Sequence, residues 1–220
     1  MSLDDIFEFI MYLSPVFLIV GVSVGTYFYE SLSKVYKILL LYLWVCLMID
    51  LLGHISAITL GNNLVFIPIF GIVELVIISL LYRKFLLVKN KALGVIILLA
   101  VSYMLYELVH LTYFEPTKFQ SYARVIDTFL LVSMSLLYTF QKVRQEPNMN
   151  YFSLNSTILI YFSVNLIIFL PINFLINEAS MLKFYFWIAN LIFTLLFYAA
   201  LTLIIWKHGK TQRQLRFGFQ

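Results

Sequence analysis

Seven long apolar stretches run along the 220-residue chain, and they constrain the fold more than any other feature. A helix needs about 20 apolar residues to cross the hydrocarbon of a bilayer, and every stretch approaches or exceeds that length. Helices are the spanning form to expect, because an open strand would leave backbone groups unpaired in lipid. We therefore predict an all-α integral membrane protein, a seven-transmembrane-helix bundle. The expected spans are about 6–28, 36–60, 64–83, 93–113, 122–143, 153–176 and 183–206.

The composition leaves no room for a soluble domain of ordinary make-up. Hydrophobic residues account for 62% of the chain and charged residues for 12%, whereas soluble domains average roughly 45–50% and roughly 25%. We expect one transmembrane domain, residues 1–206, followed by a short basic cytoplasmic tail, residues 207–220. Cys46 is the single cysteine, which excludes a disulfide or a cysteine-based metal site within one chain.

Lysine and arginine are distributed unevenly between the two sides of the predicted bundle. Of the 15 cationic residues, we assign Lys118, Arg124 and Lys183 to connections on the side of the N-terminus, and the remaining 12 to the other side. Cytoplasmic loops carry the excess of positive charge, so the N-terminus is expected outside and the C-terminus in the cytoplasm. Tyr82 and Trp206 fall at predicted cytoplasmic ends, where interfacial aromatic residues are common.

These basic loops are typical of a multi-pass protein of the cytoplasmic (inner) membrane. They would lie beside anionic lipid and could contact a membrane or cytoplasmic signalling partner. We expect the lipid bilayer, and no nucleic acid, as a partner. The sequence leaves homo-oligomerisation open.

Polar side chains within the spans are the main functional signal. Ionisable residues in a membrane are costly, and by default they mark a site or an internal pair. The candidate ligand-binding residues are Asp50, His54, Glu74, Glu107, His110, Asp127, Asn165 and Asn190. With the topology above, the whole set lies between the midplane and the outer surface. Asp50 and His54 are four residues apart and Glu107 and His110 three apart, so each pair shares a helix face.

Three functions fit this set, beside a fourth interpretation without any ligand. The first is a sensor or partner-binding module with an outward-facing polar pocket for a small ligand or proton, and it needs no cofactor. The second is a membrane-embedded metal-dependent enzyme. The third is a small transporter, which the scarcity of ionisable residues in the inner half of the spans disfavours. Under the fourth interpretation, the polar groups simply hold the helices together.

The metal alternative depends on the order of residue types along four consecutive spans. Two acid–His pairs and two lone acids are the ligand inventory of a di-metal carboxylate site in a four-helix bundle. Carboxylates and imidazoles together would suit zinc or iron. The candidate metal ligands are Asp50, His54, Glu74, Glu107, His110 and Asp127.

Four stretches carry a resemblance to a known family. They are GNNLVFIPIFGIVELVIISLLY, YARVIDTFLLVSMSLLY, ILIYFSVNLIIFL and FWIANLIFTLLFYAALTLIIW. They resemble an uncharacterised family of small bacterial seven-helix membrane proteins, which is similar to the seven-transmembrane sensing modules of some histidine kinases. The resemblance implies a seven-helix bundle in the cytoplasmic membrane and no established activity. Sensing modules of this kind carry an output domain after the last span. Residues 207–220 are too short for one, so we expect any signal to pass to a separate partner.

Overall fold

The chain folds into an all-helical bundle in the computed structural model, which describes residues 3–60, 63, 65–87, 91–113, 122–145, 151–175 and 182–217. Within these ranges the long helices are α1 (Leu3–Tyr27), α2 (Lys34–Leu60), α3 (Phe66–Leu81), α4 (Lys91–Tyr113), α5 (Tyr122–Gln145), α6 (Phe152–Leu175) and α7 (Leu182–Phe217). A 3₁₀ turn η1 (Tyr29–Ser31) follows α1, and a π-helical turn η2 (Tyr82–Leu86) extends α3. All seven long helices have the length and apolar composition to cross a membrane. The predicted class and number of spans are confirmed at this level.

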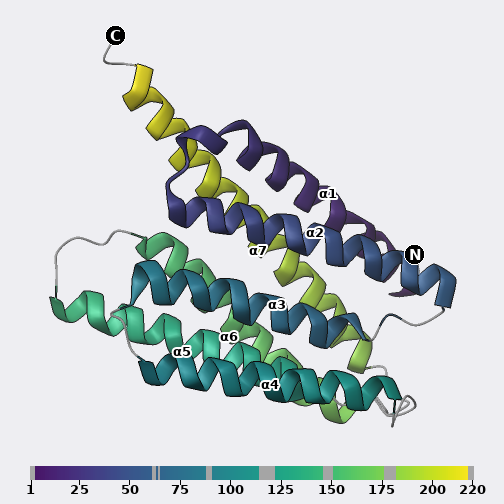
Figure 1. The fold of residues 1–220 in the computed structure, drawn as a ribbon. Coiled ribbons are helices and arrows are strands. Elements are labelled where there is room, and N and C mark those ends of the chain that lie inside the picture. The colour runs from purple at the N-terminus through teal and green to yellow at the C-terminus, as the bar shows by residue number, and fades with distance from the viewer. Residues whose placement is uncertain are drawn as a thin grey trace.

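The helices form two groups that pack along their length (Figure 1). Helix α1 packs against α2 and α7 on one side of the bundle, and α3, α4, α5 and α6 form the other side. Contacts of α2 with α3 and of α6 with α7 join the two groups. Because successive helices run in opposite directions, the beginnings of α1, α3, α5 and α7 lie at the same end as the ends of α2, α4 and α6.

Large aromatic side chains fill much of the centre between the groups. Tyr42, Tyr198 and Phe162 are almost completely buried. The rings of Tyr161 on α6 and Phe197 on α7 stack with centroids 3.9 Å apart. Buried tyrosines bring hydroxyl groups that need hydrogen-bond partners, and those partners define the polar features described below.

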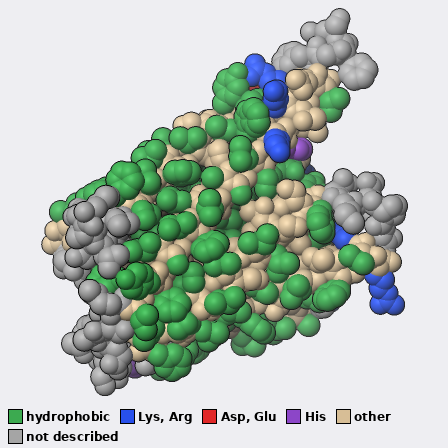
Figure 2. Space-filling model, turned by 180° about the vertical axis from the view of Figure 1, so that it is seen from behind, with side chains coloured by type: hydrophobic (Ala, Val, Ile, Leu, Met, Phe, Trp, Pro, Cys, Tyr) green, Lys and Arg blue, Asp and Glu red, His purple; other side chains and the backbone are tan. Residues whose placement is uncertain are grey.

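The flanks of the bundle are apolar, as a lipid-facing surface requires. Side chains such as Ile58, Val143 and Phe174 are 82%, 71% and 70% exposed. Figure 2 shows apolar side chains across the flank in view and lysine and arginine side chains gathered toward the end where α7 stops. Soluble monomers rarely expose apolar surface on this scale. The exposed surface therefore agrees with burial of the bundle in a membrane.

Helix α7 is longer than its predicted span of 183–206, because it continues to Phe217 through most of the expected tail. Lysine, arginine and glutamine are good helix formers, so the basic sequence can continue the helix. Gly209 lies so close to Phe28 that a β-carbon there would collide with the ring. Lys210 lies over the ring of Trp206 at 5.2 Å, and Arg213 over the ring of Tyr27 at 5.1 Å. The contacts of Gly209 with Phe28 and of Arg213 with Tyr27 hold the extension against the end of α1, and the contact of Lys210 with Trp206 lies within α7 itself.

Tyr82 differs from its expected place at the membrane surface. It is fully buried, and its hydroxyl donates to Asn155 Oδ1 at 2.7 Å. Ser135 Oγ donates to the same oxygen at 2.9 Å, and Asn155 Nδ2 donates to Thr139 Oγ1 at 2.9 Å. This Asn155 network joins η2, α5 and α6. A tyrosine near the end of a span fits either an interfacial or a buried position. The sequence does not reveal that Asn155, 73 residues further along the chain, lies beside the Tyr82 hydroxyl.

Candidate functional site

A buried ion cluster of Arg124, Glu74 and Asp127 lies between α3 and α5. Arg124 is in the first turn of α5 and is 4% exposed, while Glu74 and Asp127 are fully buried. Arg124 Nη1 donates to Glu74 Oε2, and it donates to Asp127 Oδ2 at 2.7 Å. Asp127 follows Arg124 by three residues, which puts both side chains on one face of α5.

The assignment of Arg124 to an outer connection is therefore wrong. Its place near a span end suggests an exposed residue, but its side chain points into the bundle and pairs with two acids. Removing a guanidinium from water is costly, and paired carboxylates offset that cost. One sequence signal could have identified it: Arg124 and Asp127 have opposite charges and helical i, i+3 spacing within a single apolar span.

Both oxygens of the Glu74 carboxylate are hydrogen-bonded. Tyr42 on α2 donates its hydroxyl to Glu74 Oε1 at 2.5 Å, and Arg124 on α5 binds the other oxygen. The Arg124 guanidinium also lies 5.6 Å from the ring centre of Phe70 and 5.3 Å from that of Phe169. Aromatic faces attract cations at such distances. The cluster thus connects α2, α3, α5 and α6.

The charge of the cluster is not balanced. Two carboxylates face one guanidinium, which leaves a formal excess of one negative charge when all three groups are ionised. Asp127 Oδ1 has no hydrogen-bond partner within the described ranges. The buried Arg124 therefore does not make this region positive.

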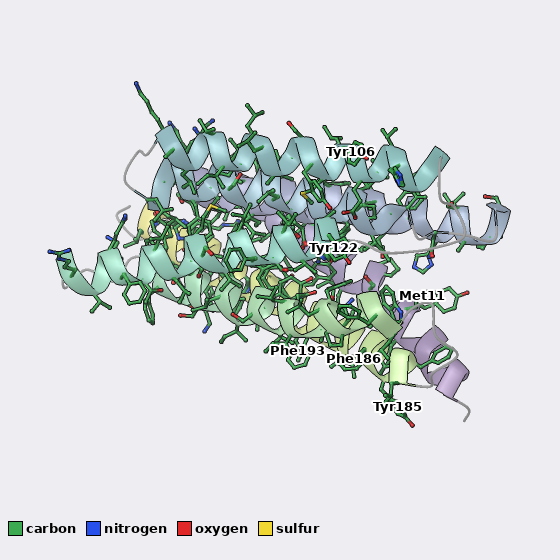
Figure 3. The ribbon with its side chains drawn as sticks, turned by 90° about the horizontal axis from the view of Figure 1, so that it is seen from below. Met11, Tyr106, Tyr122, Tyr185, Phe186 and Phe193 are labelled. Atoms are coloured by element: carbon green, nitrogen blue, oxygen red, sulfur yellow. The ribbon has the colours of Figure 1, made fainter. Side chains whose placement is uncertain are left out.

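A cavity of about 480 Å³ adjoins the cluster and includes Arg124 in its wall. Its lining residues come from α1, α2, α3, α5, α6 and α7, and they include the start of α7. Its other polar lining residues are Ser14, Asp50, His54, Asn63, Asn190 and Thr194, and its aromatic ones are Phe66, Phe70, Tyr161, Phe169, Phe184, Trp187 and Tyr198. Figure 3 shows the lining residue Met11 in the same half of the bundle as Tyr122 and Phe186, near the starts of α5 and α7. A few polar groups among apolar walls are typical of small-molecule sites.

Asp50 and His54 form one side of the cavity. His54 Nε2 lies 3.9 Å from Asp50 Oδ2, as the i, i+4 spacing predicts, and the His54 ring stacks on Tyr12 with centroids 5.9 Å apart. Asp50 Oδ2 and, from α7, Asn190 Oδ1 have no hydrogen-bond partner in the described part of the chain. Two residues of the cavity wall thus each carry a buried acceptor atom without a hydrogen-bond donor among the described residues.

Glu107, His110 and Asn165 do not line this cavity. Glu107 on α4 accepts a hydrogen bond from the backbone N–H of Ala123 at 2.8 Å. That N–H belongs to the first turn of α5, whose amides lack partners within their own helix. The ring of His110 lies 5.9 Å from that of Tyr106, and Asn165 Nδ2 donates to the Tyr161 carbonyl at 3.0 Å. Of the eight candidate ligand-binding residues, Asp50, His54 and Asn190 line the cavity. Glu74 and Asp127 do not line it, but they meet at Arg124, which does.

The donor set of the cluster suits an ion pair better than a metal. Among the described residues, no three His, Cys, Asp or Glu side chains gather in a way that could hold a metal ion. Glu74 and Asp127 do converge, but the Arg124 guanidinium lies between them, in the place that a zinc or iron ion would need. A metal cation placed beside the Arg124 guanidinium would be strongly repelled by it, because the interior of the bundle has a low dielectric constant. Asp50 and His54 supply only two ligands on their side of the cavity.

Comparisons of the chain with protein-family models, with curated proteins and with solved structures give no match.

Proposed function

We propose that the protein is a multi-pass membrane sensor module whose cavity takes up a small ligand from the outer side of the cytoplasmic membrane. The single observation that carries this proposal is the cavity itself, in which Asp50, His54, Arg124 and Asn190 face one volume of about 480 Å³. The cavity has the size and the mixed lining of a small-molecule site.

The distribution of cations supports the orientation with the cavity outside. The described cations at the other end of the bundle are Lys34, Lys37, Arg83, Lys84, Lys91, Lys142, Arg144, Lys207, Lys210, Arg213 and Arg216. At the cavity end, Arg124 is buried in the ion cluster and is not a surface charge. Since surface charge near the membrane decides orientation, the bias is stronger than the sequence count suggests.

Helix α7 offers a direct route from the cavity to the basic end. Its first half contributes Phe184, Asn190 and Tyr198 to the cavity wall, and the same helix continues to Phe217. A ligand that binds one arrangement of the helices better than another shifts the population toward that arrangement. A small shift of α7 would then change the basic surface that Lys207 and Lys210 present to a cytoplasmic partner.

The other two functions receive less support from the packing. A transporter needs a polar path to the second side, but aliphatic side chains such as Leu39, Leu43 and Ile78 are fully buried between the helices. A metal-dependent enzyme needs a ligand cluster, and the two converging acids are paired with Arg124.

Thiol labelling tests the proposal, because Cys46 is the single cysteine and is buried. In a Cys46→Ala background, Asn190→Cys should react with a membrane-impermeant thiol reagent added outside sealed right-side-out vesicles. Leu203→Cys, on the lipid-facing side of α7, should stay unreactive. Lys207→Cys should react only after the vesicles are permeabilised. An Asn190→Cys protein that reacts only from the cytoplasmic side, or only when unfolded, would contradict the proposal.

A further inference from the structure

Among the described residues that line the cavity, one side chain is acidic, that of Asp50. Arg124, the cation in the wall, is already paired with the carboxylates of Glu74 and Asp127. Asp50 and His54 are only partly exposed, at 23% and 19% of their side-chain surface, and the ion cluster is buried. Charges in such surroundings are weakly screened. The cavity should therefore attract cations and repel anions.

The hydrogen-bonding groups at the cavity call for a ligand that donates. Asp50 Oδ2 and Asn190 Oδ1 are acceptors without a protein donor among the described residues. A buried acceptor without a donor costs free energy, and a ligand N–H would recover it. The cationic group in the wall, Arg124, already donates to Glu74 and Asp127, so the acids nearby oppose an anion bound to its remaining N–H groups.

The size and the aromatic wall of the cavity argue for an organic ligand over a bare metal cation. Seven aromatic rings, including Tyr161, Trp187 and Tyr198, line a volume of about 480 Å³. This volume far exceeds the roughly 30 Å³ of one water molecule, and small ions are of similar size. Aromatic rings bind ammonium groups through their negative faces and bind apolar bodies by contact. The rings thus suit both parts of an amphipathic cation.

We infer that the cavity binds an organic cation, with an ammonium group at Asp50 and Asn190 and an apolar body against the aromatic wall. This inference rests on the proposed function and specifies the ligand class of the same site.

Labelling with reagents of opposite charge tests the inference without a known ligand. The reporter is Leu191→Cys in the Cys46→Ala background, because Leu191 lines the cavity and Asn190 then stays in place. This protein is treated with a trimethylammonium-ethyl and with a sulfonatoethyl methanethiosulfonate, and each labelling rate is divided by the rate of the same reagent with a simple thiol in solution. The cationic reagent should be favoured by about tenfold or more, and added salt should reduce this ratio. Equal rates, or preference for the anion, would overturn the inference but leave the accessible cavity standing. If neither reagent reacts, the proposed function itself fails.

Protection from labelling tests the ligand class directly. Benzylammonium, whose N–H groups can donate to Asp50 and Asn190, should slow labelling of Leu191→Cys several-fold, whereas phenylacetate or sodium chloride at the same ionic strength should not. Protection by phenylacetate would overturn the cationic class, and equal protection by sodium would overturn the organic class. Asp50→Asn, which keeps the side-chain shape, should lower both the cation preference and the protection. The control Glu30→Gln neutralises an exposed acid outside the cavity and should change neither. An Asp50→Asn protein with unchanged preference and protection would place the cation elsewhere.

Discussion

At the scale of single residues, Arg124 joins side chains from three helices. Its guanidinium binds carboxylates from α3 and α5 and lies beside rings from α3 and α6. A buried ion pair need not be more stable than apolar side chains of the same volume, but removing one partner leaves an uncompensated buried charge. The cost of losing Arg124 should therefore greatly exceed that of losing an exposed arginine.

Replacing Arg124 by methionine tests this role. Arg124→Met should lower the free energy of unfolding by about 3–5 kcal/mol, because Glu74 and Asp127 would remain buried without their cation. The matched control is Arg144→Met, at the exposed end of the same helix, which should change it by less than about 0.5 kcal/mol. Denaturation of the purified protein in mixed detergent micelles measures both. Adding Glu74→Gln and Asp127→Asn to Arg124→Met should restore part of the stability. Equal effects of the two arginine substitutions would contradict this role.

The sequence predicts only part of the site at this scale. Asp50 and His54, and likewise Arg124 and Asp127, share a helix face because of their spacing, and the structure brings each pair together. Glu74 and Arg124 are 50 residues apart, and no local pattern links them. Glu107 also looks like a ligand in the sequence, but its partner is the Ala123 backbone N–H, which cannot be identified from residue types.

At the scale of helices, the two ends of the bundle are held by different polar contacts. The ion cluster ties α3 to α5 near the cavity, and the Asn155 network ties η2, α5 and α6 toward the other end. Hydrogen bonds between helices are important in membranes, because apolar burial does not distinguish a neighbouring helix from lipid. The Asn155 network should therefore contribute to stability without any role in ligand binding.

Removing the Asn155 side chain tests this expectation. Asn155→Ala leaves the buried hydroxyls of Tyr82 and Ser135 without their shared acceptor, which should cost about 1–3 kcal/mol of unfolding free energy. Ser153→Ala, two residues earlier on the exposed face of α6, serves as the control and should have little effect. The charge preference of labelling at Leu191→Cys should stay unchanged in folded Asn155→Ala. An altered preference would mean that the two polar clusters are coupled.

The bounds of the helices were much easier to predict than the faces they bury. The predicted span 93–113 compares with Lys91–Tyr113, and 122–143 with Tyr122–Gln145, because long apolar runs stop where polar residues begin. Buried faces are not readable in the same way. The side of a membrane helix that faces lipid is as apolar as the side that faces the core, so periodicity carries little information.

At the scale of the whole molecule, the two ends of the bundle differ in their surface charge and in the presence of the cavity. Exposed cations gather at the end where α7 stops, and the cavity, with Asp50 and the paired Arg124 in its wall, lies near the opposite end. Lysine and arginine counts predicted this asymmetry, since it depends on composition and order alone. The position of the cavity between the two groups of helices depends on packing between distant segments, which the sequence does not specify.

The most direct measurement of the central claim is the distance between Arg124 and Glu74 in a lipid bilayer. Solid-state NMR on protein labelled with ¹⁵N-arginine and ¹³C-glutamate should show dipolar coupling between a guanidinium nitrogen and a side-chain carboxyl carbon about 4 Å apart, the spacing of an ion pair. The coupling should disappear in Glu74→Gln and in Arg124→Lys. If the protein in bilayers shows no such coupling, or if the coupling persists in Glu74→Gln, the buried ion cluster beside the cavity does not exist as described.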